Sequence, residues 1–158
     1  MQYNRQKAVQ YALHWWNARN PRFYNFENLG GDCTNFVSQC LNFAGIQMDF
    51  APNGWFYNNL NSRAPAWTGV NEFYTYGINN SKNVGVKFKE CPIEETEIGD
   101  LVQLVTKNRR VFHHTAIITE KLGNTLSNVF ITCHTNNAKN KPLSAYNIKN
   151  YRFLKVLN

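Results

Sequence analysis

The sequence predicts an α+β fold in which N-terminal helices pack on an antiparallel β-sheet. In the first 44 residues, apolar side chains recur at the three-to-four-residue spacing of amphipathic helices. From residue 84 onward the pattern changes to short β-rich segments separated by turn residues. Helices followed by a run of strands are typical of this class. A chain of 158 residues has the usual length of one domain, so we treat 1–158 as a single domain.

The first predicted helix spans residues 3–18 and is ended by Asn20-Pro21. Its apolar residues form one stripe: Ala8, Tyr11, Ala12, Trp15 and Trp16. This stripe predicts a helix that packs with one face against the core.

The second predicted helix spans residues 33–44, with Asp32 as its N-cap and Gly45 as its stop. The apolar stripe of this helix is Phe36, Val37, Cys40, Leu41 and Ala44. Cys33 stands at the head of the same stripe, so we expect its side chain to face the body of the protein.

Residues 46–82 are irregular and rich in aromatic side chains, with one short helix predicted over 70–78. Trp55 and Trp67 are the largest of these side chains. A long aromatic segment fits two interpretations equally well. The rings either line a substrate cleft or form a second small core.

The second half of the chain predicts an antiparallel meander. Its five expected strands are Val84–Phe88, Leu101–Val105, Val111–Glu120, Val129–His134 and Arg152–Leu157. Turn residues at 122–124 and 127–128 separate the third strand from the fourth.

Charge and composition restrict the function classes. The net charge of +7 favours an anionic partner, but the basic residues are scattered and no basic helix occurs, so we expect no nucleic-acid partner.

No apolar run reaches the ~20 residues of a membrane-spanning helix. No signal peptide is visible, which leaves two localisations open: a cytoplasmic protein, or an excised extracytoplasmic or cell-wall domain. We expect a monomer.

The four cysteines do not form a metal-binding pattern. They lie at positions 33, 40, 91 and 133, without a CxxC pair or zinc-ligand spacing. We therefore expect no metal or other cofactor. Cys40, Cys91 and Cys133 fit small buried hydrophobic residues.

Cys33 is the exception, because it follows a glycine turn at a helix start, within Gly30–Gln39. The N-terminus of a helix presents unpaired N–H groups and a partial positive charge. A thiol at this position is expected to have a lowered pKa, and the thiolate is the nucleophile. The segment therefore predicts a cysteine enzyme.

Three histidines are candidates for the base that such a nucleophile needs. His113 and His114 are neighbours at a strand start, so at most one of them faces Cys33, and periodicity does not choose between them. Antiparallel pairing with the next strand would bring His134 beside that start, where it could orient the base. Asn136 is a second candidate for an orienting or oxyanion role.

The residues that carry this chemistry resemble a known group. Gly31-Asp32-Cys33, Ile98–Val102 and His114–Ile118 resemble the papain-like NlpC/P60 and CHAP cysteine peptidases and amidases of bacterial cell walls. A closer resemblance is to the putative amidase domain family (amidase type 6). Three segments carry it: Gly30–Gln39, His134-Thr135-Asn136 and Pro142-Leu143-Ser144.

The resemblance implies a papain-like NlpC/P60 fold and a set of catalytic roles. In this sequence Cys33 is the nucleophile, His114 the general base, His134 the third residue and Asn136 an auxiliary residue. The expected reaction is hydrolysis of amide bonds, in peptidoglycan or a related peptide, through a Cys33 thioester. An acyltransferase on the same fold and a non-catalytic wall-binding module are the alternatives.

Four residues complete the expected site as substrate-binding groups. They are Asp32 and Asn35, which flank the nucleophile, and the indoles Trp55 and Trp67.

Overall fold

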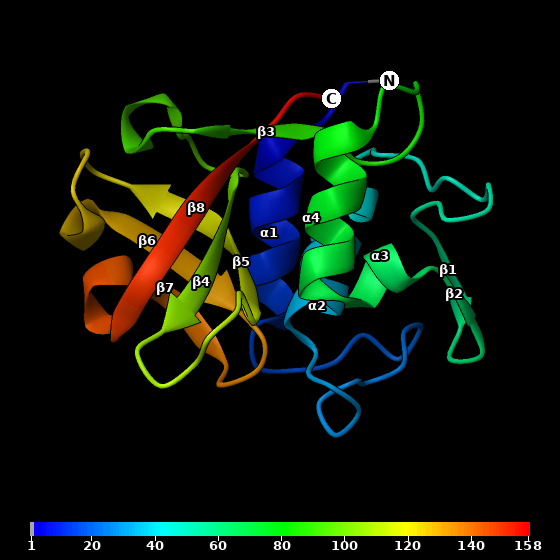
Figure 1. Ribbon diagram of the computed structural model, residues 1–158, viewed down its shortest axis with the longest axis horizontal. Coiled ribbons are helices and arrows are strands. Elements are labelled where there is room, and N and C mark those ends of the chain that lie inside the picture. The colour runs from blue at the N-terminus through cyan, green and yellow to red at the C-terminus, as the bar shows by residue number, and fades with distance from the viewer. Residues whose placement is uncertain (1) are drawn as a thin grey trace.

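The computed structural model describes residues 2–158 and contains a six-stranded antiparallel sheet with helices gathered to one side of it (Figure 1). The helices are α1 (Arg5–Trp15), α2 (Cys33–Phe43), α3 (Pro65–Thr68) and α4 (Val70–Asn79). The sheet contains β3 (Phe88–Cys91), β4 (Leu101–Thr106), β5 (His114–Lys121), β6 (Val129–Cys133), β7 (Ala138–Pro142) and β8 (Ile148–Val156). A separate hairpin pairs β1 (Tyr57–Asn59) with β2 (Ser62–Arg63), and single 3-10 turns cover Ile93–Glu95, Leu126–Asn128 and Leu143–Ala145.

The strand order is β3-β8-β4-β5-β6-β7, and every neighbouring pair is antiparallel. The predicted combination of N-terminal helices with an antiparallel sheet is therefore confirmed. Strands β4 to β7 follow one another as a meander, whereas β8 returns to lie between β3 and β4 (Figure 1).

Several strands differ from the sequence prediction, and two of these differences have identifiable reasons. The expected strand at Val84–Phe88 begins only at Phe88, because Gly85 adopts a φ of +77° in a loop that hydrogen-bonds to Gln47. Strand β7 was not predicted. Its sequence, Ala-Lys-Asn-Lys-Pro, is polar because β7 is an edge strand with one side unpaired.

The sheet is covered by apolar residues on both faces. Leu101 and Ile117 belong to the core shared with the helices, whereas Val102, Ala116 and Ile118 belong to a second core on the opposite face. Strands buried on both faces have continuous apolar runs instead of alternation. This is why periodicity does not show which face a given residue of β5 occupies.

An ion pair joins the first helix to the centre of the sheet. The Arg5 guanidinium lies 2.6 Å from Asp100 Oδ1 and donates to the Val156 carbonyl oxygen at 2.9 Å. The same carboxylate oxygen of Asp100, a residue with no exposed surface, accepts the Val156 N–H at 3.0 Å. These contacts tie α1, β4 and β8 together at one end of the molecule.

Trp55 and Trp67 belong to the core, which corrects their assignment as substrate-binding residues. Both side chains have 0% exposed surface, and their ring centroids are 4.7 Å apart. The Trp55 indole N–H donates to Ser38 Oγ at 3.0 Å, and the Trp67 indole N–H donates to Asn35 Oδ1 at 2.9 Å. Large apolar rings with a satisfied N–H are stable inside a core, where no substrate reaches them.

Among residues 2–158, no helix has the length and apolar character that crossing a membrane requires.

Replacing Gly77 tests the packing of α4 on β3. A Cβ atom at this buried position would lie 2.2 Å from the Phe88 ring. Alanine has a higher helix propensity than glycine, which favours Gly77→Ala. We expect the steric clash with Phe88 to outweigh this gain and to lower the free energy of unfolding by about 1–3 kcal/mol. Urea denaturation measures the change. The exposed Thr75→Ala in the same helix is the control, with an expected change within about 0.5 kcal/mol; equal stability of the two variants would contradict the packing.

Candidate active site

Cys33 begins helix α2 immediately after a glycine turn, as the sequence predicts. Gly30 and Gly31 have φ values of +89° and +100°, which side chains other than glycine rarely adopt. The Phe36 N–H donates to the Asp32 carbonyl oxygen and closes the first turn of the helix. The chain therefore reverses sharply and places Cys33 at the head of a helix whose residues 33–41 are all buried.

The Cys33 sulfur lies against the backbone of β5, on both sides of His114. It is 3.9 Å from the His113 carbonyl oxygen, and the Thr115 backbone N–H donates to it. The neighbouring Thr34 hydroxyl lies 3.8 Å from the sulfur. The structure thus brings the predicted nucleophile to the strand segment that carries the predicted base.

Burial raises the pKa of the Cys33 thiol, which corrects the expectation of a lowered value. Hydrogen bonds from Thr115 and Thr34 lower the pKa, but they only partly offset the loss of hydration. In the free protein Cys33 is therefore a neutral thiol at neutral pH. Its reactivity requires a partner that removes the proton during the reaction.

The ring of His114 is not committed to another partner, because neither of its nitrogens makes a hydrogen bond within residues 2–158. Its ring lies beside Tyr146, with the two centroids 6.4 Å apart, and it keeps 7% of its surface exposed. Its Nε2 atom is buried and has no hydrogen-bond partner. Buried polar atoms without partners are rare, and they concentrate at functional sites.

His113 is engaged elsewhere. Its Nε2 accepts the Thr106 backbone N–H at 3.2 Å, at the hairpin between β4 and β5. Burial, the Arg109 charge and His114 all lower the pKa of His113, which favours the neutral ring that this contact needs. Of the two neighbouring histidines, His113 stabilises the hairpin and His114 keeps a free nitrogen.

His134 lies on the opposite face of the sheet from His114. The register pairs Ile117 with Thr132, so continuing it by two residues places His134 opposite Thr115, and successive side chains alternate between the faces. Accordingly, the His134 ring stacks on Phe36 of α2, with centroids 3.9 Å apart. Within residues 2–158 no hydrogen bond joins His134 to His114, so the structure does not bring this expected pair together.

The hydrogen bonds of His134 hold the helices instead. Its Nδ1 lies 2.5 Å from Asp32 Oδ2, and its Nε2 donates to the Trp15 carbonyl oxygen at 2.7 Å. Both partners are acceptors, so a ring protonated on both nitrogens, paired with the Asp32 carboxylate, satisfies both contacts together. His134 thereby links the end of α1 to the turn before Cys33.

Asp32 and Asn35 are fully buried, which corrects their assignment to substrate binding. Asp32 Oδ1 accepts the Phe26 N–H at 2.8 Å and Asn35 Nδ2 at 2.9 Å. Arg19 Nε lies 3.4 Å from Asp32 Oδ2. Asp32 occupies the N-cap position of α2, but its carboxylate makes no capping bond because these other donors occupy it.

The segment after His134 forms a tight turn. Thr135 and Asn136 both have left-handed φ values, of 62° and 59°. The Thr135 hydroxyl accepts the Asp32 backbone N–H at 2.9 Å, whereas Asn136 is exposed and makes no side-chain hydrogen bond within the described chain. Asn136 therefore does not contact the candidate base.

The sequence did not predict a series of hydrogen-bonded polar side chains behind Cys33. The hydroxyls of Thr34 and Thr115 are 2.9 Å apart, and Gln103 Nε2 donates to Thr115 Oγ1 at 3.2 Å. Arg152 donates to Gln103 Oε1 at 2.6 Å from Nη2. The available signal was a glutamine inside the apolar run Leu-Val-Gln-Leu-Val, since a buried polar side chain needs a partner.

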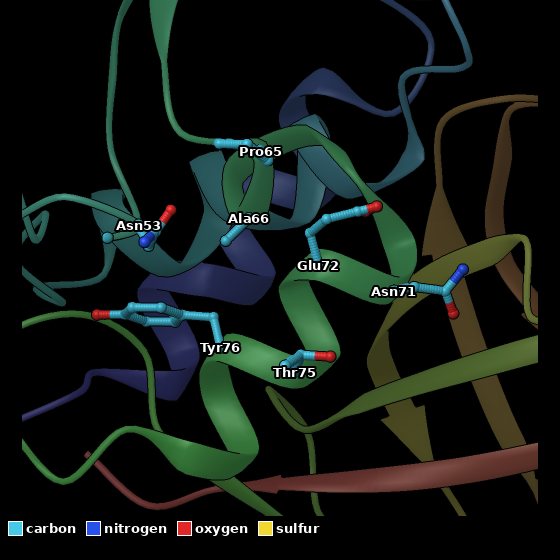
Figure 2. Close-up of a pocket in the computed structure, with 8 residues that line it drawn as sticks. Asn53, Pro65, Ala66, Asn71, Glu72, Thr75 and Tyr76 are labelled. Atoms are coloured by element: carbon cyan, nitrogen blue, oxygen red, sulfur yellow. The ribbon is translucent and has the colours of Figure 1, made fainter.

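A cavity of about 440 Å³ lies between α3, α4 and the loop at Asn53 (Figure 2). Pro65 and Ala66 of α3 and Glu72 of α4 contribute to its walls, which are mainly apolar. Neither Cys33 nor His114 lines this cavity. Across residues 2–158, no group of three or more His, Cys, Asp or Glu side chains is arranged to hold a metal ion.

A family model described as "Putative amidase domain" matches residues 2–156. The chain belongs to this amidase family. It is also 37% identical over 123 residues to the uncharacterized protein YhbB of Bacillus subtilis (strain 168). That match covers 76% of this chain and 38% of YhbB, so the chain spans well under half of its relative. No solved structure matches the chain.

His134→Leu tests the structural role of the pair with Asp32. Removing the imidazole leaves a buried carboxylate without its closest partner. We expect the free energy of unfolding to fall by about 3–5 kcal/mol, measured by urea denaturation. His14→Leu, at an exposed position of α1, is the matched control and should stay within about 0.5 kcal/mol of wild type. A His134→Leu variant as stable as the control would show that the pair does not hold the turn.

Proposed function

We propose that this chain is a cysteine amidase that hydrolyses amide bonds of bacterial cell-wall peptidoglycan, with Cys33 as nucleophile and His114 as general base. One observation carries the proposal. The thiol at the start of α2 lies against the backbone on both sides of His114, whose ring makes no hydrogen bond within residues 2–158. Membership of an amidase family supports the reaction class. A helix bearing the nucleophile and a sheet bearing the base are also what a papain-like NlpC/P60 fold requires.

The reaction would proceed in two steps. As the Cys33 sulfur attacks the substrate carbonyl carbon, His114 takes the thiol proton and then gives it to the departing amine. Water, deprotonated by His114, next attacks the thioester and releases the acid and the free thiol. The Cys33 N–H at the helix start, where N–H groups lack intrahelical partners, can stabilise the oxyanion.

The raised pKa of the Cys33 thiol determines how the proton leaves it in this mechanism. Because burial keeps Cys33 neutral in the free protein, His114 acts as a true general base and not as the partner of a preformed thiolate. His134 has a positioning role here, since its ring is committed to Asp32 and Trp15.

The choice of peptidoglycan rests on two arguments. The resemblance of the Cys33 and His114 segments to cell-wall amidases points to stem-peptide amides. The net charge of +7 also favours association with an anionic wall polymer.

Digestion of purified peptidoglycan tests the substrate. We expect the wild-type chain to release new amine and carboxyl termini, seen by mass spectrometry of the soluble fragments. Cys33→Ala should abolish this release, because it removes the nucleophile, whereas Cys91→Ala, at a half-buried thiol outside the site, should retain it. Products that couple to an added amine would indicate acyl transfer. Unchanged peptidoglycan with the wild type would exclude it as substrate.

Alkylation of Cys33 tests the nucleophile and base without a substrate. At pH 7 we expect iodoacetamide to modify Cys33 about tenfold or more faster in wild type than in His114→Ala, since His114 accepts the proton. In His114→Ala, the rate should rise only at alkaline pH, because burial raises the pKa of the Cys33 thiol above its usual range. Peptide mapping separates Cys33 from Cys91. Equal rates for wild type and His114→Ala at pH 7 would contradict the pairing.

A further inference from the structure

None of the residues expected in the candidate site orients His114. His134 faces the helices, and Asn136 is exposed in the turn after β6. A catalytic imidazole needs one nitrogen held by a neighbour so that the other has a defined protonation state. The unpartnered Nε2 of His114 is therefore the atom to account for.

Tyr146 is an aromatic neighbour of the His114 ring. It follows the 3-10 turn Leu143–Ala145 and packs against the second core, on the same face of the sheet as His114. The two rings are inclined by 35°, with their centroids 6.4 Å apart. The two side chains share no hydrogen bond within residues 2–158, and this separation leaves room for one between the hydroxyl and Nε2.

The Tyr146 hydroxyl also lacks a strong partner. Its one hydrogen-bond contact within residues 2–158 is with the Cys133 sulfur at 3.8 Å, and sulfur is a weak acceptor. Burial and Cys133 raise the pKa of Tyr146, so the hydroxyl stays protonated and neutral. The Lys141 ammonium lies 4.3 Å from the ring centroid, which helps to hold the ring in place. A buried ring nitrogen without a partner and a half-buried hydroxyl with a weak one thus belong to neighbouring rings.

We propose that Tyr146 is the positioning residue of the base: its hydroxyl accepts the Nε2–H of His114 and leaves Nδ1 to take the proton of Cys33. This inference rests on the proposed function, because it assigns the partner of the same base. The bond needs an Nε2–H, which the ring carries both in the neutral form that leaves Nδ1 free and in the protonated form that arises during the reaction. It replaces the weak contact between Tyr146 and Cys133.

Tyr146→Phe keeps the ring and removes only the hydroxyl. We expect its melting temperature to stay near that of wild type and its Cys33 alkylation rate at pH 7 to fall most of the way to the His114→Ala value. The double variant should alkylate no more slowly than His114→Ala alone, since the hydroxyl acts through the imidazole. Tyr151→Phe, at a 40% exposed tyrosine of β8, is the control and should keep the wild-type rate.

The tautomer of His114 gives a second readout that needs no variant. Long-range ¹H–¹⁵N spectra of wild type should show the His114 proton on Nε2 in the neutral ring, and Tyr146→Phe should shift this population toward Nδ1. Two results would overturn the inference: a Tyr146→Phe variant with the same alkylation rate and His114 tautomer as wild type, or a neutral wild-type ring protonated on Nδ1. Either result would leave intact the difference in Cys33 alkylation rate between wild type and His114→Ala. Loss of that difference would instead overturn the proposed function.

Discussion

The buried Asp32 carboxylate is the contact on which the position of Cys33 depends. Its two oxygens bind the Phe26 N–H, the Asn35 amide and the His134 ring, while its own N–H binds the Thr135 hydroxyl. These partners come from the loop before the glycine turn, from α2 and from the turn after β6. One residue thus joins three segments of the chain, and the proposed nucleophile, Cys33, is the next residue.

The two faces of the sheet carry different parts of the candidate site. On the helix face, His134 and the chain of Thr34, Thr115 and Gln103 fill the space beneath α2 with paired polar groups. On the opposite face, His114 lies with Tyr146 over the second core. The Cys33 sulfur lies against the backbone of β5, at the His113 carbonyl oxygen and the Thr115 N–H. A buried polar network that is paired on one face can hold the proposed nucleophile rigidly, while the proposed base on the other face stays free of hydrogen bonds.

Local signals predicted the nucleophile helix well. The glycine turn, the apolar stripe and Gly45, with its φ of +109°, place α2 within one residue of the expected bounds, because all of these features act within a few residues of each other. The pairing of β5 with β6 was also expected. What the sequence did not reveal was the register, and a register decides which face each histidine occupies. With apolar residues on both faces, no alternation was present to indicate it.

Burial accounts for the other differences. Trp55, Trp67, Asp32 and Asn35 have residue types that suit a binding cleft, but all four are buried. The segment 46–82 places Trp67 against Asn35, whereas Phe26, His134 and Thr135 surround Asp32. Burial also reverses the expected direction of the Cys33 pKa, because the loss of hydration outweighs the hydrogen bonds from Thr115 and Thr34. Burial depends on contacts between distant segments, so composition and spacing do not determine it.

The central claim is that Cys33 carries the substrate acyl group during the reaction. Acid quenching of the wild-type chain during turnover of a peptidoglycan fragment, followed by peptide mapping by mass spectrometry, measures this directly. We predict an acyl adduct on the peptide that contains Cys33. Hydroxylamine should remove this adduct, because it cleaves thioesters. Substrate turnover with no adduct on this peptide, or with an adduct on Cys40, Cys91 or Cys133 instead, would contradict the claim.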